Sequence, residues 1–165
     1  MSRAFVKEND LEHAGIDIPE RPVSLEKNYV TEIGLSQIKE NIETLHNERQ
    51  KITAKDDTIS KQMKMRIERD IRYFAARLKS AIVIKNENQS SDSVLFGAKV
   101  ELENEDDTKE YFKIVGEDEA DLKLRKISYV SPIAKSIIGS KVGDEVVLSK
   151  PEGFETLIIK KITYK

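Results

Sequence analysis

Residues 128–148, with the sequence SYVSPIAKSIIGSKVGDEVVL, contain a complete set of signals for one short helix. Ser131 is suited to cap a helix, and Pro132 fits the first helical position because its missing N–H has no helical partner to lose. The run IAKSII that follows allows two turns at most, and Gly139 fits the position just after a helix end. The stretch therefore predicts a short helix that leads through KVGDEV into a strand.

Short strands are predicted on both sides of this helix, because the hydrophobic period approaches two from Ile82 onward. Before the helix, strands are expected within 94–104, 110–116 and 126–130, and the acidic turn NEDDTK joins the first two. After the helix, strands are expected in DEVVLSK and ETLIIKKITYK, joined by the turn PEGF. We therefore expect residues 82–165 to form a small, mostly antiparallel sheet with one short helix.

Residues 29–81 have a helical hydrophobic period instead. Thr31 is suited to cap the first helix, and apolar residues then recur at spacings of three and four, with Arg49 interrupting the stripe. A second stripe runs from Ile59 to Leu78, and the polar stretch TAKDDT separates the two. This pattern predicts an antiparallel helical hairpin, a short coiled coil with arms of roughly 22 residues and about 33 Å. One long helix is the alternative, but it would leave both stripes without a partner in a monomer.

Residues 1–28 are polar and of mixed charge, and they contain Gly15, Pro19 and Pro22. Each proline removes a hydrogen-bond donor and biases the preceding residue toward extended backbone, so we expect a tail or strap over a neighbouring part. The segment lacks the apolar stretch of a signal peptide, and no part of the chain approaches ~20 apolar residues. The sequence therefore predicts a soluble, cytoplasmic protein without a membrane partner.

The charges of the chain are segregated along the sequence. The total of 28 basic and 30 acidic residues gives a net charge of −2, but residues 49–79 contain ten basic and four acidic residues. Residues 101–121 contain ten acidic residues and two lysines. These runs are either solvated faces or surfaces for partners of opposite sign. The absence of cysteine excludes disulfides, thiolate metal sites and cysteine nucleophiles.

Few residues suggest chemistry within the chain. His13 and His46 are the only histidines, and neither belongs to a metal-binding, triad or phosphate-loop pattern. The acidic turn NEDDTK fits a solvated hairpin turn better than a cation site. Asp56 and Asp57, at the expected hairpin tip, could offer oxygen ligands to a hard cation such as Mg²⁺. The alternative for this pair is an ordinary turn with an acid near the start of the second helix.

Several separated motifs make the C-terminal part resemble the transcription elongation factors GreA and GreB. They are FGAKVELEN, FKIVGEDEAD, ISYVSPIAKSIIGSKVGDEVVL and the closing IIKKITYK, in the order and at the spacing of that family. Upstream, YVTEIGLSQIKENIETL and IERDIRYFAARLKSAIVI resemble the two coiled-coil helices of the family. The resemblance covers about residues 29–165. It implies an α+β fold in which an antiparallel helical hairpin precedes an FKBP-like antiparallel β domain.

The resemblance also implies a partner, bacterial RNA polymerase. The β domain would dock at the rim of the secondary channel, and the hairpin would point into it. In Gre factors, acids at the tip help hold the second Mg²⁺ of the polymerase and promote cleavage of backtracked RNA. The polymerase supplies the catalytic centre, so we expect no enzyme activity and no cofactor of this chain's own. The docking patch would comprise Ser128, Ser131, Pro132, Ile133, Ala134 and Lys135. The basic hairpin face, toward nascent RNA or acidic channel walls, would comprise Lys61, Lys64, Arg66, Arg69 and Arg72.

The hairpin tip departs from the family pattern. It reads QKITAKDDTISKQ, without the G-D-x-x-E-N acids, and the hairpin is about 13 residues shorter than in GreB-like sequences, roughly 10 Å of reach. Asp56 and Asp57 are adjacent, whereas the acids of the family are three apart. Val130 stands where many relatives have a polar residue, which would alter the docking contacts.

Three functions remain open from the sequence. The first is a Gre-type regulator of elongation, with or without stimulation of RNA cleavage. The second is a Rnk-like competitor that binds polymerase without stimulating cleavage. The third is a peptide-binding or prolyl-isomerase domain, which needs an aromatic-lined pocket. The aromatic residues that this domain offers for such a pocket are Phe96, Tyr111, Phe112, Tyr129, Phe154 and Tyr164.

Overall fold

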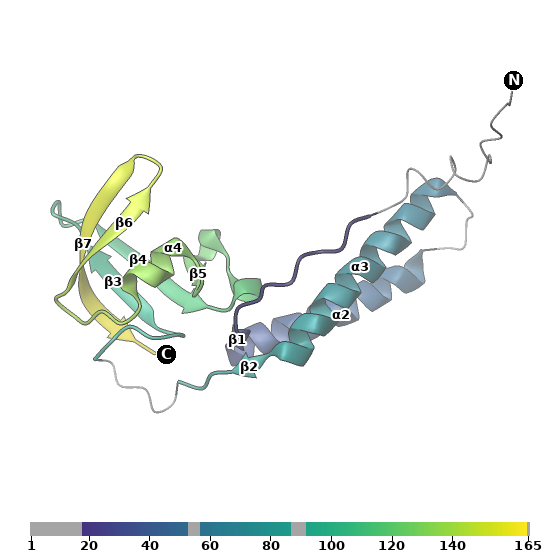
Figure 1. The fold of residues 1–165 in the computed structure, drawn as a ribbon, viewed down its shortest axis with the longest axis horizontal. Helices are drawn as coiled ribbons and strands as arrows, with labels where there is room; N and C mark the ends of the chain where they lie inside the picture. The colour runs from purple at the N-terminus through teal and green to yellow at the C-terminus, as the bar shows by residue number, and fades with distance from the viewer. Residues whose placement is uncertain (1–17, 53–56, 87–91, 165) are drawn as a thin grey trace, which may run out of the picture.

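The computed structural model describes residues 18–52, 57–86 and 92–164, and it has two parts (Figure 1). Helices α2 (Glu32–Lys51) and α3 (Thr58–Ser80) lie side by side and extend away from the second part, a curled sheet that packs against α4 (Pro132–Ile137). This is the expected α+β architecture, a helical hairpin followed by a β domain with one short helix. The alternative of one long helix through the tip is wrong.

Both long helices begin at side-chain caps that the sequence supplies. Thr31 Oγ1 accepts a hydrogen bond from Gly34 N at 2.9 Å, and Asp57 Oδ1 accepts one from Ser60 N at 2.7 Å. The 20 and 23 residues of α2 and α3 correspond to helices of about 30 and 35 Å. The two apolar stripes meet between the helices, although most of their side chains stay half exposed. The hairpin thus projects as a slender arm.

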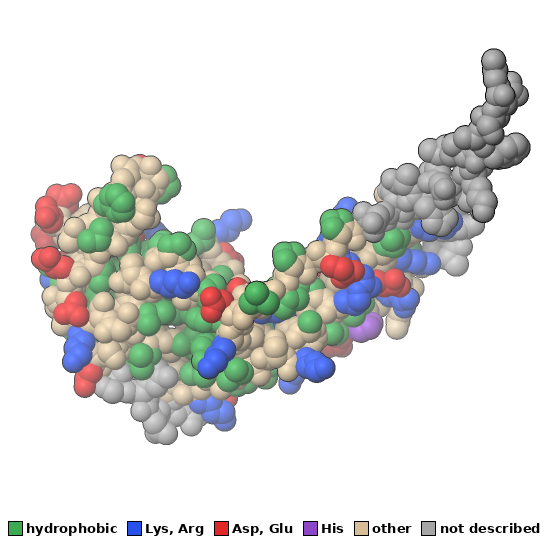
Figure 2. Space-filling model, in the orientation of Figure 1, with side chains coloured by type: hydrophobic (Ala, Val, Ile, Leu, Met, Phe, Trp, Pro, Cys, Tyr) green, Lys and Arg blue, Asp and Glu red, His purple; other side chains and the backbone are tan. Residues whose placement is uncertain are grey.

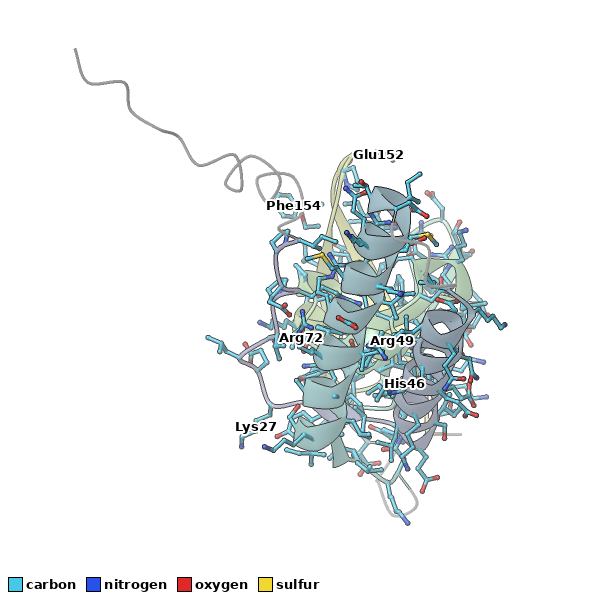
Figure 3. All side chains as sticks on the ribbon, turned by 90° about the vertical axis from the view of Figure 1, so that its right-hand side faces the viewer. Lys27, His46, Arg49, Arg72, Glu152 and Phe154 are labelled. Atoms are coloured by element: carbon cyan, nitrogen blue, oxygen red, sulfur yellow. The ribbon has the colours of Figure 1, made fainter. Side chains whose placement is uncertain are left out.

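Arg49 interrupts the apolar stripe of α2 because it forms an ion pair across the hairpin. Its Nε and Nη2 donate to Glu68 Oε1 of α3 at 2.9 and 2.6 Å. Figure 3 shows Arg49 in the space between the two helices. The break in the sequence pattern is therefore a cross-helix polar contact.

The two ends of the hairpin meet in a small parallel ladder that the sequence did not predict. Strand β1 (Tyr29–Val30) pairs with β2 (Ile82–Val83), so the chain joins and leaves the hairpin at one point. Two residues on each side are too few to produce a hydrophobic period. The ladder holds the bases of α2 and α3 together.

Five strands form the main sheet in the order β5-β4-β3-β7-β6. They are β3 (Lys99–Glu103), β4 (Lys109–Val115), β5 (Lys126–Ser128), β6 (Glu145–Lys150) and β7 (Gly153–Thr163). All pairs are antiparallel except β4 with β5, which confirms a mostly antiparallel sheet. The two turns of α4 cover one face, and the core between them includes Val100, Leu102, Ile114, Leu148, Leu157, Ile159, Ala134 and Ile137.

Two strand boundaries differ from the prediction. The strand expected within 94–104 starts only at Lys99, because Gly97 has a left-handed φ of +84° and turns the chain before it. The turn expected at PEGF is shorter, since Gly153 already pairs with Lys150 and belongs to β7. Two 3-10 turns, η1 (Glu117–Glu119) and η2 (Leu122–Leu124), connect β4 to β5, and η1 lies in the acidic run.

Residues 18–28, which we call the strap, run in extended form along α3 (Figure 1). The Arg21 guanidinium lies 3.8 Å from the centroid of the Tyr73 ring, and its Nη1 is 3.6 Å from the Asp70 carboxylate. Near the base, Asn28 Nδ2 donates to the backbone oxygen of Arg77 at 2.8 Å. Of the two alternatives, a tail or a strap over a neighbouring part, residues 18–28 form the strap.

Candidate functional site

A buried ion-pair network joins the hairpin to the β domain. Arg77, on the last turns of α3, is 1% exposed, and its Nε donates to Asp118 Oδ2 of η1 at 2.5 Å. Its Nη2 reaches Glu117 Oε2 at 3.2 Å, and the Tyr73 hydroxyl donates to Asp118 Oδ1 at 2.7 Å. One guanidinium therefore bridges two carboxylates that follow β4 in the chain.

This network shifts two pKa values. Burial, reinforced by the hydrogen bond to Asp118, raises the pKa of Tyr73 to about 12. Burial acts to lower the pKa of Arg77, but the bonds to Asp118 and Glu117 outweigh it and the pKa is raised. The Arg77 charge is consequently fixed at this junction.

Glu119 forms a second contact between the two parts. It is buried, the Thr31 hydroxyl donates to it, and Lys126 Nζ lies 3.2 Å from it. A Cβ added to Gly34 would stand 2.8 Å from Glu119 Oε2, so a side chain at this position would displace the Glu119 carboxylate from its present contacts. The acids at the end of the acidic run are therefore junction residues, and the reading of that run as a solvated face is wrong for Asp118 and Glu119.

Three aromatic rings complete the junction. Tyr29, Phe96 and Tyr129 lie with ring centroids 5.5 to 6.1 Å apart, and the Tyr129 hydroxyl donates to the backbone oxygen of Lys27 in the strap. Strap, hairpin base and β domain thus meet in one cluster. The hairpin is held in a defined direction relative to the sheet.

The six aromatic residues considered for a peptide pocket do not line one pocket in the described structure. Phe112 is buried in the core, whereas Phe154 is 82% exposed near the β6–β7 turn, where Figure 3 labels it. Tyr111 lies on the outer face of the sheet, and Phe96 and Tyr129 belong to the junction cluster. This scatter does not favour the peptide-binding alternative.

The predicted docking patch lies around α4. Ser131 caps the helix, with its Oγ accepting from Ala134 N at 3.2 Å, and Pro132 occupies the first turn as expected. Pro132 and Lys135 are exposed, whereas Ile133 packs partly against the core. Ala134 is fully buried and faces the core, so it supports the patch from below and is not available to a partner. Ser128 and Ser131 are half-buried beside it.

The hairpin tip is described in part. Asp57 caps α3 and also accepts from Ser60 Oγ at 3.1 Å, while Asp56 lies outside the described residues. Apolar side chains remain exposed near the tip, with Ile59 at 71% and Met63 at 52%. No group of three or more acidic or histidine side chains in the described part of the chain is placed to hold a metal ion.

The predicted basic face of the hairpin is interrupted by carboxylates. Arg69 pairs with Asp70 at 2.9 Å, and Arg72 pairs with Glu20 of the strap, which holds the pKa of Glu20 below its ordinary value. Figure 2 shows acidic and basic side chains beside one another on the hairpin, and Figure 3 places Arg72 on the side of the strap. The remaining members of the predicted face are Lys61, Lys64 and Arg66.

The fold combines a helical hairpin with a small β domain, and comparison with known proteins identifies the family. A family model described as "Transcription elongation factor, GreA/GreB, C-term" matches residues 89–164. The transcription elongation factor GreB of Neisseria meningitidis serogroup B is 37% identical over 154 residues, covering 84% of this chain and 94% of that protein. GreA of Zymomonas mobilis is 39% identical over 105 residues, covering 64% and 66%.

This chain belongs to the GreA/GreB family of transcription elongation factors. The family resemblance seen in the sequence is confirmed, and relatives named GreA and GreB do not favour the Rnk-like alternative. Among solved structures, a GreA/GreB factor from Nitrosomonas europaea is similar with a TM-score of 0.43 and 22% identity, covering 84% of this chain and all of that one. No helix of the described residues is long and apolar enough to cross a membrane.

Proposed function

We propose that this protein regulates elongation in the cytoplasm by binding RNA polymerase as a monomer, with α4 docked at the rim of the secondary channel and the hairpin directed into it. The observation that carries the proposal is the buried, hydrogen-bonded junction around Arg77. It fixes the direction of a slender arm relative to a separate docking surface. A channel-inserting factor needs both parts in one fixed relation, because docking then aims the tip.

The exposed residues of α4 form the docking contact in this proposal. Pro132 presents a rigid apolar surface and Lys135 a positive charge, while the buried Ala134 sets their height above the sheet. A rim of acidic residues on the partner would complement Lys135, and such a pair chiefly affects the rate and specificity of association.

The length of the hairpin is the feature that separates this chain from its longer relatives. The alignment with the Neisseria protein spans 154 positions, but 84% of this 165-residue chain is only about 139 residues. About 15 positions of the relative thus have no counterpart here, and we assign most of them to the hairpin. Shared between two arms, they correspond to about 10 Å of length.

Stimulation of transcript cleavage is a second candidate function, and it depends on the tip. Asp57 is held at the start of α3 by its cap, and each oxygen of a carboxylate can accept more than one contact. Together with Asp56 it would offer oxygen ligands to an Mg²⁺ ion that belongs to the polymerase, and that ion would activate the water. The protein itself would then position a charge and would not act as an enzyme.

A backtracked elongation complex tests both functions. Fluorescently labelled protein is titrated with core polymerase, and RNA shortening is followed in the same samples. We expect Pro132→Ala with Lys135→Glu to weaken binding about tenfold or more, and Lys141→Glu, on a neighbouring loop, to bind like the unmodified protein. Unchanged binding by the α4 variant, or no binding by any form, would overturn the docking proposal.

The tip is tested with Asp56→Asn and Asp57→Asn together, because asparagine caps a helix as well as aspartate and removes only the charge. Loss of RNA shortening with retained binding would show that shortening requires the negative charge of the tip acids, as metal ligation predicts. If the unmodified protein binds and never shortens the transcript, cleavage stimulation is excluded and regulation by channel occupancy stands.

A further inference from the structure

The outer face of the sheet carries lysines directly opposite one another on three strands. Lys99 of β3 pairs in register with Lys113 of β4, which in turn pairs with Lys126 of β5. Like charges at opposed positions repel, so such a row costs stability unless counter-charges lie nearby. Glu119 supplies one for Lys126 at 3.2 Å, but no described carboxylate lies within ion-pair distance of Lys99 or Lys113.

Tyr111 stands beside this row and is 42% exposed. Two shallow hollows adjoin it, and both are lined by Tyr111 and Lys99. The other residues of the first hollow are Glu101, Lys161 and Thr163. The other residues of the second hollow are Phe112, Lys113, Leu124, Arg125 and Lys126. An aromatic ring is therefore bracketed by cations on both sides.

The one carboxylate in these hollows is already paired. Glu101 accepts from Lys109 Nζ at 2.7 Å, which partly neutralises it. Arg125 projects from a left-handed backbone position with φ of 56°, and its guanidinium lies 5.9 Å from the Phe112 ring. Lys99, Lys113 and Arg125 thus remain available to an anion that approaches from solvent.

We propose that this face, defined by Lys99, Tyr111, Lys113, Arg125 and Lys161, binds single-stranded nucleic acid. Phosphates need clustered cations, and unpaired bases stack on an exposed aromatic ring, so the combination fits a strand with splayed bases better than an acidic peptide. The surface lies on the β domain, apart from both α4 and the basic residues of the hairpin. It goes beyond the proposed function, because it requires no polymerase.

The test measures fluorescence anisotropy of labelled, unstructured oligonucleotides of roughly 12 nucleotides, as RNA and as DNA of the same sequence, with the free protein. We expect Lys99→Gln with Lys113→Gln to reduce the slope of log affinity against log salt by about 1.4, near 0.7 for each lost phosphate contact. Tyr111→Ala should weaken binding about tenfold, whereas Tyr111→Phe should retain it because the ring is kept.

Matched controls remove the same charge elsewhere. Lys39→Gln with Lys141→Gln should leave the salt slope unchanged. Arg66→Gln with Lys64→Gln tests whether the basic residues of the hairpin bind the oligonucleotide instead. Circular dichroism confirms that each variant is folded. Loss of binding only in the hairpin variant, or no binding of RNA or DNA at 25 mM salt, would overturn the proposal. So would capture of a polyglutamate peptide, but not of oligonucleotide, that depends on Lys99 and Lys113.

Discussion

Arg77→Ala is expected to be strongly destabilising, because Arg77 is buried between the hairpin and the β domain. The substitution leaves the carboxylates of Asp118 and Glu117 close together without the guanidinium that bridges them. Removal of one partner from a buried ion pair costs roughly 3–5 kcal/mol, because the other charge stays desolvated. The Arg77 side chain is 1% exposed and that of Asp118 9%, so their ion pair is buried and this range applies to it.

The structure places the expected cost at the lower end of that range. The Glu117 side chain is 22% exposed and can recover water, and Asp118 keeps the hydrogen bond from Tyr73. We therefore expect Arg77→Ala to lower the free energy of unfolding by about 3 kcal/mol. Arg77→Lys should cost less, since it keeps the charge and loses the planar fork.

Urea unfolding followed by circular dichroism measures this difference through the linear dependence of free energy on denaturant. Arg49→Ala is the matched control, because Arg49 also binds a carboxylate but its side chain is 51% exposed and that of Glu68 39%. Exposed pairs contribute about 1 kcal/mol or less, so the control should change little. Equal costs for the two variants would refute the assignment of a buried, bridging role to Arg77.

Three further outcomes follow from the junction and the strap. The pKa of Tyr73 is about 12 in the folded protein and about 10 in the unfolded chain, so the unmodified protein should lose stability as the pH rises from 10 to about 12. Tyr73→Phe should abolish this loss, and urea titrations of both proteins across this range check the difference. Gly34→Ala should destabilise by about 1–3 kcal/mol through its clash with Glu119, and a thermal melt that shows stabilisation, as helix propensity alone predicts, would contradict the packing. Arg21→Ala should cost about 1–2 kcal/mol in urea unfolding by removing its stacking on Tyr73, and no change would show that the strap is not docked.

Local rules explain the parts of the fold that could be predicted from the sequence. Thr31 and Ser131 cap helices because a side-chain oxygen reaches an amide three residues on, and this needs only neighbouring residues. The two apolar stripes predicted the hairpin because each pairs with the other across a short turn. Gly139, with φ of +88°, follows α4 as its position in the sequence indicated.

The junction could not be predicted, because its partners are far apart in the chain. Arg77 and Asp118 are separated by 41 residues, and Thr31 and Glu119 by 88. In a chain with 35% charged residues, nothing local distinguishes a charge that will be buried from one that stays in water. The sequence offered one indirect signal. Gly34 lies in the first turn of a helix, where local structure gives no reason for glycine, so a long-range contact at that position was the remaining explanation.

The candidate site was predicted unevenly for the same reason. The S-P-I-A element indicated α4 correctly, but only the structure distinguishes the exposed Pro132 and Lys135 from the buried Ala134. The sequence predicted a basic face on the hairpin without its counter-charges. Glu20, which pairs with Arg72, lies 52 positions away in the chain, so no local pattern indicated the pair. The role of Asp57 as a metal ligand remains a prediction.

The parallel pairing of Tyr29 with Ile82 makes the hairpin a module of adjustable length. Both arms are anchored at the same point, so removal of one heptad from each shortens the arm by about 10 Å and returns the apolar stripes to nearly the same facing. Neither the sheet nor the junction around Arg77 needs to change. Gain or loss of whole heptads can therefore change the length of the arm independently of the surface around α4.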